Sequence, residues 1–279
     1  MKIQIWGCRG SLAAPGPETV RYGGNTSCVE LRLRDGTLVV LDAGTGIRKL
    51  GAKVAEEGIK KVHLLLTHLH LDHLEGIGFF TPIWDPEVEL NIWGPPSPTR
   101  PLAERVATLF APPLFPEHIS DVPSQVRFHD FNEGVLPIDG AKITVQRVAH
   151  RGPTVAYRVE ENGSVFAYIP DHEPARGEDI ERTDADLLSG LSTARDVDLL
   201  FHDAQYSEEE YPSHSGWGHS SIRDTVSFGR VTGAKQVVMF HHDPRHSDEQ
   251  LEVMLKRAEE LWGSGDRPVL AHEGFEAEL

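Results

Sequence analysis

Short apolar segments alternate with segments of helical periodicity along this chain, a pattern typical of an α/β protein. One segment, residues 27–33, alternates apolar side chains at Val29, Leu31 and Leu33, as a strand with one buried face does. The other apolar runs are short and continuous, which predicts buried strands. The predicted strands span residues 3–6, 27–33, 38–42, 62–66, 88–93, 143–148, 155–159, 165–169, 199–201 and 237–240.

Turn and helix signals connect these strands. The Asn-Gly pair at 162–163 stands between two predicted strands and predicts a tight hairpin. Apolar residues at helical spacing predict a helix over residues 47–58, ended by a glycine. A last long helix begins at Ser247, whose spacing to Gln250 matches a capping box, and continues to about residue 262.

A proline-rich segment interrupts this pattern. Eight of the nineteen prolines lie between residues 95 and 123, around one short helical stretch at 102–110. Because proline cannot continue a central strand, we expect an insertion over the surface here. It would serve as a lid over a site, a dimer contact or a rigid connection. The chain has no internal repeat or linker, so residues 1–279 are expected to form a single domain.

Five predicted strands end at a residue that can bind a metal ion or move a proton. The carboxyl ends of strands in an open α/β sheet meet along one edge, where such proteins place their sites. A single case would only mark where the chain surfaces, but five cases favour a common site. The residues are His68 after Thr67, His150, Asp171, His202 with Asp203, and His241.

The densest of these clusters has the form H-x-H-x-D-H. His68 and His70 are two residues apart in extended chain, so they point to the same side and can bind one ion together. Asp72 and His73 lie beyond the strand end, where a turn could direct them to a second ion. Imidazole and carboxylate ligands suit zinc, manganese or iron, and the spacing favours two adjacent metals.

This motif, with the later single residues, resembles the metallo-β-lactamase superfamily over essentially the whole chain. The resemblance implies an α/β fold, a four-layer αββα sandwich, with two divalent ions between the sheets. Zinc is the first expectation, with manganese or iron as alternatives. By position, His68, His70 and His150 would hold the first ion, Asp72, His73 and His241 the second, with Asp171 bridging the two. His242 beside His241 and His172 beside Asp171 remain alternatives.

Two further segments resemble the same superfamily. Asp42, in the turn after a predicted strand, would orient a ligand, although a turn or cap role explains it equally. Gly218-His219-Ser220-Ser221 resembles the motif of the phosphodiesterase branch, which includes the transfer-RNA 3′-processing nucleases. The resemblance implies that His219 is the general acid, oriented by Asp203, and that Asp72 belongs with them in catalysis. Either serine would also cap the helix that follows.

The amino-acid composition disfavours some classes of binding partner. The chain has 27 Lys and Arg against 43 Asp and Glu, a formal net charge of −16, which disfavours a protein that holds long nucleic acid. No apolar run reaches the ~18 residues of a membrane span. The two cysteines form no C-x-x-C pair, so a reduced, cytoplasmic protein is expected. A small-molecule phosphodiester is the expected partner, and a homodimer is left open.

The family resemblance also limits which reactions are expected. The nucleases of this branch carry a long basic arm, but only twenty residues separate His150 from Asp171 here. Hydrolysis of small phosphodiesters is therefore expected, foremost 3′,5′- or 2′,3′-cyclic nucleotides to nucleoside monophosphates. The alternatives are thioester or lactone hydrolysis of the glyoxalase II type, a metal-dependent nuclease, and a non-enzymatic nucleotide sensor.

Three residues are expected to contact the substrate. The glycine-rich segments 7–11 and 22–27 resemble a bacterial group likened to cyclic-nucleotide phosphodiesterases. Their backbone could approach a phosphate closely, and Asn25 or Thr26 could donate a hydrogen bond to it, although tight turns explain the same residues. Trp217, beside His219, could stack on a base.

Overall fold

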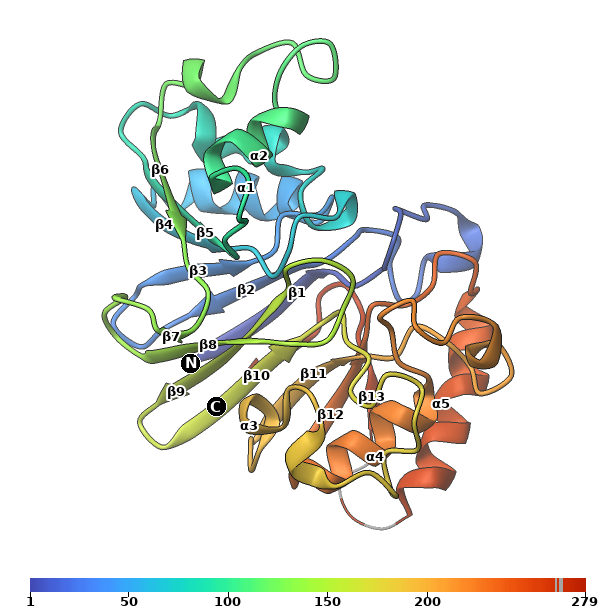
Figure 1. Cartoon of the computed structure of the whole chain (residues 1–279). Helices are drawn as coiled ribbons and strands as arrows, with labels where there is room; N and C mark the ends of the chain where they lie inside the picture. The colour runs from blue at the N-terminus through green and yellow to red at the C-terminus, as the bar shows by residue number, and fades with distance from the viewer. Residues whose placement is uncertain (264, 266–267) are drawn as a thin grey trace.

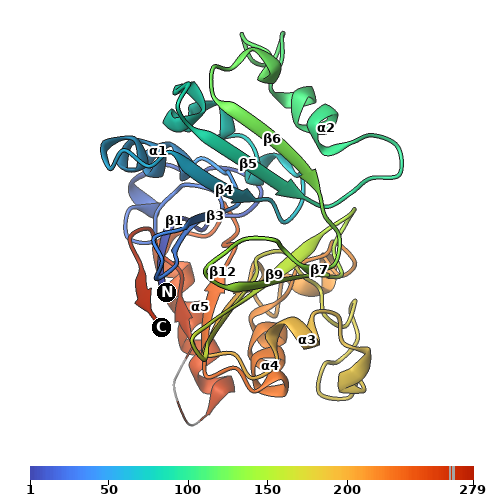
Figure 2. The same cartoon turned by 90° about the vertical axis from the view of Figure 1, so that its left-hand side faces the viewer.

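The computed structural model of the protein describes residues 1–263, 265 and 268–279. Two sheets pack face to face (Figures 1 and 2), and each has seven strands among the described residues. In the first sheet the strand order is β14 (Glu276–Glu278), β1 (Lys2–Gly7), β2 (Cys28–Arg32), β3 (Leu38–Leu41), β4 (Lys61–Leu65), β5 (Glu89–Gly94) and β6 (Gln125–Asp130). In the second it is β13 (Val269–Leu270), β12 (Gln236–Phe240), β11 (Leu199–Asp203), β10 (Ser164–Ile169), β9 (Val155–Glu161), β8 (Lys142–Arg147) and β7 (Gly134–Val135).

Helices cover the outer face of each sheet (Figure 1). The first sheet carries α1 (Ile47–Glu56) and α2 (Leu102–Leu109); the second carries α3 (Leu191–Ala194), α4 (Ile222–Thr232) and α5 (Asp248–Trp262). Short 3₁₀ helices span Pro17–Thr19, Leu71–His73, Ile77–Phe79, Thr81–Trp84, Ile119–Asp121, Ala185–Leu187 and Tyr211–Ser213. No helix in the described part of the chain is long and apolar enough to cross a membrane.

The apolar side chains form a core between the sheets and further clusters beneath the helices. The central core joins residues such as Ile5 and Leu31 of the first sheet to Tyr157, Phe201 and Phe240 of the second. Since each sheet is buried on both faces, its strands read as continuous apolar runs. This layering confirms the predicted αββα sandwich.

Local signals in the sequence specified several elements closely. Ser164 pairs with Glu161, and the two turn residues between them have positive φ, 50° at Asn162 and 88° at Gly163, as a type I′ hairpin requires. Ser247 caps α5: its side chain accepts from the Gln250 amide, and the Gln250 side chain accepts from the Ser247 amide. The predicted hairpin and last helix are confirmed.

The proline-rich segment connects two strands of the first sheet. Residues 95–123 are the crossover between the parallel strands β5 and β6, and α2 lies beside β6 (Figure 2). Its apolar side chains Leu102, Val106 and Phe110 are buried in the core under the first sheet. These side chains add to the core, while most of the segment's other residues lie at the surface, so its role as a lid, a dimer contact or a rigid connection stays a prediction.

Candidate functional site

The candidate ligands follow strands of both sheets and meet along one edge. His68 follows β4, Asp171 follows β10 and His241 follows β12, while Asp203 is the last residue of β11. Strands β10, β11 and β12 run parallel, so their carboxyl ends share that edge. His150 comes from the turn after β8. The fold thus gathers residues that are up to 173 positions apart in the sequence.

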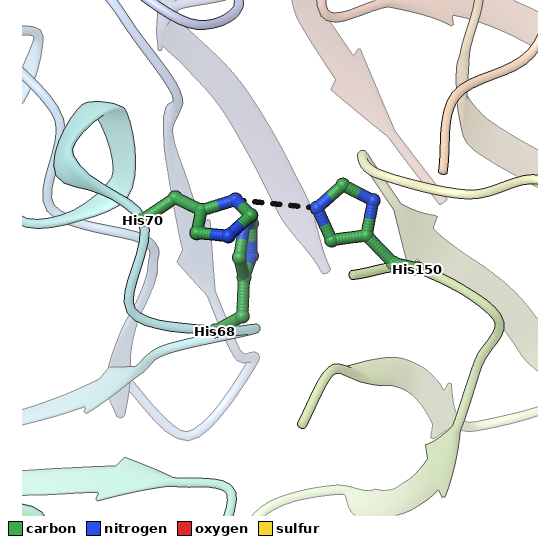
Figure 3. A group of neighbouring side chains, drawn as sticks. All are labelled: His68, His70 and His150. Carbon is green, nitrogen blue, oxygen red and sulfur yellow. Dashed lines mark hydrogen bonds between the residues drawn. The ribbon is translucent and has the colours of Figure 1, made fainter. Parts of the chain in front are cut away.

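Three histidines form the first donor group. Figure 3 shows His68 and His70 on one loop with His150 facing them from the other side, where His70 Nδ1 lies 3.2 Å from His150 Nε2. One ring nitrogen from each of the three lies within 4.8 Å of the others. The predicted placement of His68 and His70 on the same side of the extended chain agrees with this arrangement.

A second donor group lies next to the first. The short helix Leu71–His73 turns Asp72 and His73 toward His241, as a turn after the strand was expected to do. Asp72 Oδ2 is 3.3 Å from His73 Nε2 and 3.1 Å from His241 Nε2. All three side chains are buried. The six histidine and aspartate ligands expected from the sequence therefore fall into the two expected groups.

Asp171 stands between the groups. Its Oδ1 lies 3.7 Å from both His68 Nε2 and His150 Nε2, and 3.2 Å from His241 Nε2. Its Oδ2 lies 3.1 Å from His73 Nε2. A carboxylate in this position can bind a cation in each group, which is the bridging place expected for Asp171.

The donor atoms fit divalent cations. Three of them, His68 Nε2, His73 Nε2 and Asp171 Oδ2, are buried and make no hydrogen bond to any described residue. An unsatisfied buried polar atom costs about 1–3 kcal/mol, and cations coordinated in the two donor groups would satisfy all three atoms. Burial holds the pKa of His68 well below its ordinary value and lowers that of His150 to about 4. Both imidazoles are therefore neutral at pH 7, the form that binds metal.

The buried carboxylates of Asp72 and Asp171 favour a positive charge in the second donor group. Burial alone would lower the pKa of His241, but Asp171 and Asp72 outweigh it and raise that pKa to about 9. A bound cation would supply the positive charge that a proton on this ring otherwise supplies. The site thus combines neutral nitrogen donors with buried carboxylates, a donor set that suits zinc, manganese or iron.

Asp42 orients one of the ligands. It follows β3, and its carboxylate accepts hydrogen bonds from the Thr67 amide at 2.8 Å and the Tyr168 hydroxyl at 3.0 Å. His73 Nδ1 lies 2.8 Å from the same carboxylate, so it donates there and leaves Nε2 free for a cation. Of the two roles that the sequence allowed for Asp42, the structure supports the orienting one.

Replacing Asp42 by asparagine is expected to weaken metal binding about 10–100-fold, the usual cost of losing such a supporting contact. An amide cannot accept three hydrogen bonds as the carboxylate does, and its NH₂ group would face the N–H of His73. Metal affinity is measured by titration against a chelating dye. Asp139→Asn, an exposed aspartate before β8, is the matched control. Unchanged affinity in Asp42→Asn would remove the orienting role.

His241 and His242 point in different directions. His241 has a positive φ of 61° and points into the second donor group, where its Nδ1 lies 3.0 Å from Gln205 Oε1. His242 points away, with its Nε2 2.9 Å from the Ala271 carbonyl oxygen. His172 also faces away from the donor groups, because its Nδ1 lies 3.0 Å from His202 Nε2. Neither alternative ligand belongs to a donor group among the described residues.

The glycine-rich segment 7–11 contacts two of the candidate ligands. The Ser11 amide donates to Asp72 Oδ2 at 2.7 Å. A Cβ on Gly10 would lie 2.3 Å from the His241 ring, so only glycine permits this approach. Sequence reasoning missed these contacts, and that of Gln205 with His241, because backbone donors and distant partners leave no local pattern.

His219 and Asp203 form a pair at the edge of the donor groups. His219 Nδ1 lies 2.7 Å from Asp203 Oδ2, which also accepts from the His172 amide at 3.0 Å. Asp203 is fully buried, so the ring of His219 is held firmly. With Nδ1 engaged, Nε2 is the nitrogen of His219 left for a substrate. Ser221 caps α4, as its sequence position predicted.

The three expected substrate contacts fare differently. Trp217 is 51% exposed, two residues before His219 in the sequence. Thr26 is fully buried, and its hydroxyl donates to Glu75 and accepts from the Thr45 amide. The Asn25 amide group donates to Glu273 at 2.8 Å. Both side chains thus hold the loop that bears them, and a substrate contact by Asn25, which is half-buried, stays a prediction.

Known proteins resemble this chain in sequence and in fold. The sequence model described as "Beta-lactamase superfamily domain" matches residues 37–242. A curated relative, Ribonuclease Z of Myxococcus xanthus, is 24% identical over 87% of this chain and 88% of its own. The metallo-beta-lactamase fold protein YhfI from Bacillus subtilis has a TM-score of 0.73 at 18% identity, covering 99% of this chain and 98% of that one. For the short form of human tRNase Z the TM-score is 0.69 at 18% identity, with 100% and 99% covered.

Proposed function

Since the chain belongs to the beta-lactamase superfamily, as a relative of the transfer-RNA 3′-processing nucleases, we propose that it hydrolyses small phosphodiesters at two divalent ions. Membership of the family and the His/Asp clusters make it a metal-dependent hydrolase. Cyclic nucleotides are the first substrates to test, in the 3′,5′ or 2′,3′ form, with nucleoside monophosphates as products. The observation that carries the proposal is the His219–Asp203 pair beside two complete donor groups.

Different side chains would have different roles in the reaction. His68, His70 and His150 would hold one ion and Asp72, His73 and His241 the other, with Asp171 shared. Divalent ions in these places would supply Lewis acidity, which lowers the pKa of water and offsets the charge of a phosphoryl group. Asp203 fixes the ring of His219, so that Nε2 can give a proton to the alkoxide that leaves. Trp217 offers an aromatic face on which a nucleobase can stack.

A histidine placed to donate a proton suits the hydrolysis of a phosphodiester better than that of a thioester. The oxygen that leaves an unactivated phosphodiester is a strongly basic alkoxide, which needs a proton as its bond breaks. A thiolate leaves a thioester without that help. A buried aspartate that holds a histidine at 2.7 Å is therefore most useful for alkoxide departure. A nuclease is the second candidate, because the curated relative named Ribonuclease Z matches nearly the whole chain.

A hydrolysis panel with zinc- or manganese-loaded protein tests the proposal. It contains bis-p-nitrophenyl phosphate, both types of cyclic nucleotide, a linear dinucleotide, precursor transfer RNA, S-lactoylglutathione and a cephalosporin. We expect turnover of the phosphodiesters, with the small ones cleaved faster than precursor transfer RNA. Turnover of the thioester or the cephalosporin without any phosphodiester would overturn the proposal. Cleavage of precursor transfer RNA alone would select the nuclease instead.

A further inference from the structure

Three arginines lie together beside the metal centre of a strongly acidic protein. Arg147 ends β8, Arg151 follows the ligand His150, and Arg176 lies in the loop after Asp171. All three are exposed, and none forms an ion pair with an acidic residue in the described ranges 1–263, 265 and 268–279. With 43 acidic residues in the chain, unpaired arginines that gather at one place indicate an anionic ligand.

These arginines line two adjoining hollows. One, of about 370 Å³, is lined by Arg147 and Arg176 together with His150, and no acidic residue contributes to it. The other, of about 170 Å³, is lined by Arg151 and Arg176, again with His150. Because His150 lines both hollows and also belongs to the first donor group, the hollows lie next to that group.

One acidic residue, Glu173, lines the smaller hollow, but its carboxylate is already engaged. It is 4% exposed, and it accepts hydrogen bonds from the Tyr211 hydroxyl at 2.9 Å and from the amides of Gly216 and Gly218 at 2.7 and 2.9 Å. Glu173 thereby shapes the loop that carries Trp217. Among the described residues it forms no ion pair with these arginines, so three positive charges there face one negative charge.

Arg151 is set in place by the same loop. Its Nε donates to the Gly216 carbonyl oxygen at 3.2 Å, and its guanidinium lies 5.6 Å from the centre of the Trp217 ring. The remaining guanidinium nitrogens are free to bind phosphate oxygens, as arginine does in bidentate fashion. An aromatic face and an arginine side by side match a nucleoside that carries a phosphate.

We propose that the hollows bind a second, non-reacting phosphate of the substrate, held by Arg147, Arg151 and Arg176. The inference rests on the proposed phosphodiesterase function and narrows its substrate class. The preferred substrate is a small phosphodiester that also carries a phosphate monoester on the same nucleoside. An acidic protein can then draw in a small substrate of high negative charge without a long basic surface.

Matched chromogenic substrates test this proposal. Thymidine 5′-(p-nitrophenyl phosphate) is compared with and without a 3′-phosphate, and thymidine 3′-(p-nitrophenyl phosphate) with and without a 5′-phosphate. In one of the two series we expect the added phosphate to raise kcat/KM about tenfold or more at low ionic strength, through KM. The gain should shrink as salt is added. No gain in either series would overturn the proposal.

Arginine variants test whether the rise in kcat/KM caused by the second phosphate comes from binding in the hollows. In Arg147→Ala/Arg176→Ala the gain should fall to about unity, while kcat/KM for the substrates without a second phosphate changes less than about twofold. Arg48→Ala, an exposed arginine of α1 on the outer face of the other sheet, controls for the loss of one charge and should keep the gain. A gain that persists in the double variant would contradict the assignment.

Direct binding separates failure of this inference from failure of the proposed function. If no diester is turned over, the proposed function has failed, and calorimetry then decides the phosphate site on its own. Thymidine 3′,5′-bisphosphate and each thymidine monophosphate are titrated into the zinc-loaded protein. Tighter binding of the bisphosphate that is lost in Arg147→Ala/Arg176→Ala would support the site, and equal affinities would overturn it.

Discussion

Replacing Asp171 by alanine is expected to lower phosphodiester hydrolysis by roughly a thousandfold or more. The two oxygens of this carboxylate lie within 3.7 Å of donor nitrogens in both groups, and the side chain is almost fully buried. Without it, four histidine nitrogens lose the charge that joins the two groups. The measurement is kcat/KM for bis-p-nitrophenyl phosphate at saturating zinc, with the metal content of each sample determined alongside.

Two control variants accompany this measurement. Asp179→Ala removes an exposed aspartate from the loop that follows Asp171 and should leave the rate unchanged. Asp171→Asn keeps the side-chain volume, so an equal loss in that variant assigns the effect to charge rather than to packing. If Asp171→Ala folds as judged by circular dichroism and keeps more than about a tenth of the wild-type rate, the bridging role is refuted.

Replacing His219 by alanine is expected to have an effect that depends on the leaving group. For a linear dinucleotide, whose alkoxide must be protonated, the rate should fall about 10²–10⁴-fold, the usual contribution of general acid catalysis. A p-nitrophenolate leaves without a proton, so the rate for bis-p-nitrophenyl phosphate should fall much less. The two losses are compared at the same metal content.

Asp203→Asn should reproduce this pattern in weaker form, because Asp203 would influence the leaving group through its contact with His219. His118→Ala removes an exposed imidazole from the proline-rich segment and should change neither rate. Equal losses on both substrates in His219→Ala would remove His219 from the acid role. They would show instead that the side chain supports the donor groups, since its ring stacks 5.0 Å from that of His241.

The parts of the fold that could be predicted depend on local signals. The hairpin at Asn162-Gly163 follows from the need for positive φ at two positions, and the start of α5 follows from the mutual hydrogen bonds of Ser247 and Gln250. His68 and His70 could be assigned as a pair because two residues of extended chain share a side. In each case the deciding contact lies within a few residues in sequence.

The parts that could not be predicted depend on distant contacts. Strand β6 at Gln125–Asp130 alternates Val126 and Phe128 with polar residues at a sheet edge and has no apolar run, so it was not among the predicted strands. Nothing local marks Thr26 as buried against Glu75 and Thr45. The arginines at 147, 151 and 176 form a cluster only because two loops meet, and the net charge of −16 pointed away from them.

Titration of metal-free protein with zinc, followed by the rate of bis-p-nitrophenyl phosphate hydrolysis, tests the central claim most directly. The account predicts no hydrolysis without metal, a rate that rises as zinc binds, and saturation at two ions per chain, one for each donor group. Hydrolysis by the metal-free protein, or full occupancy by two ions without any hydrolysis, would contradict it.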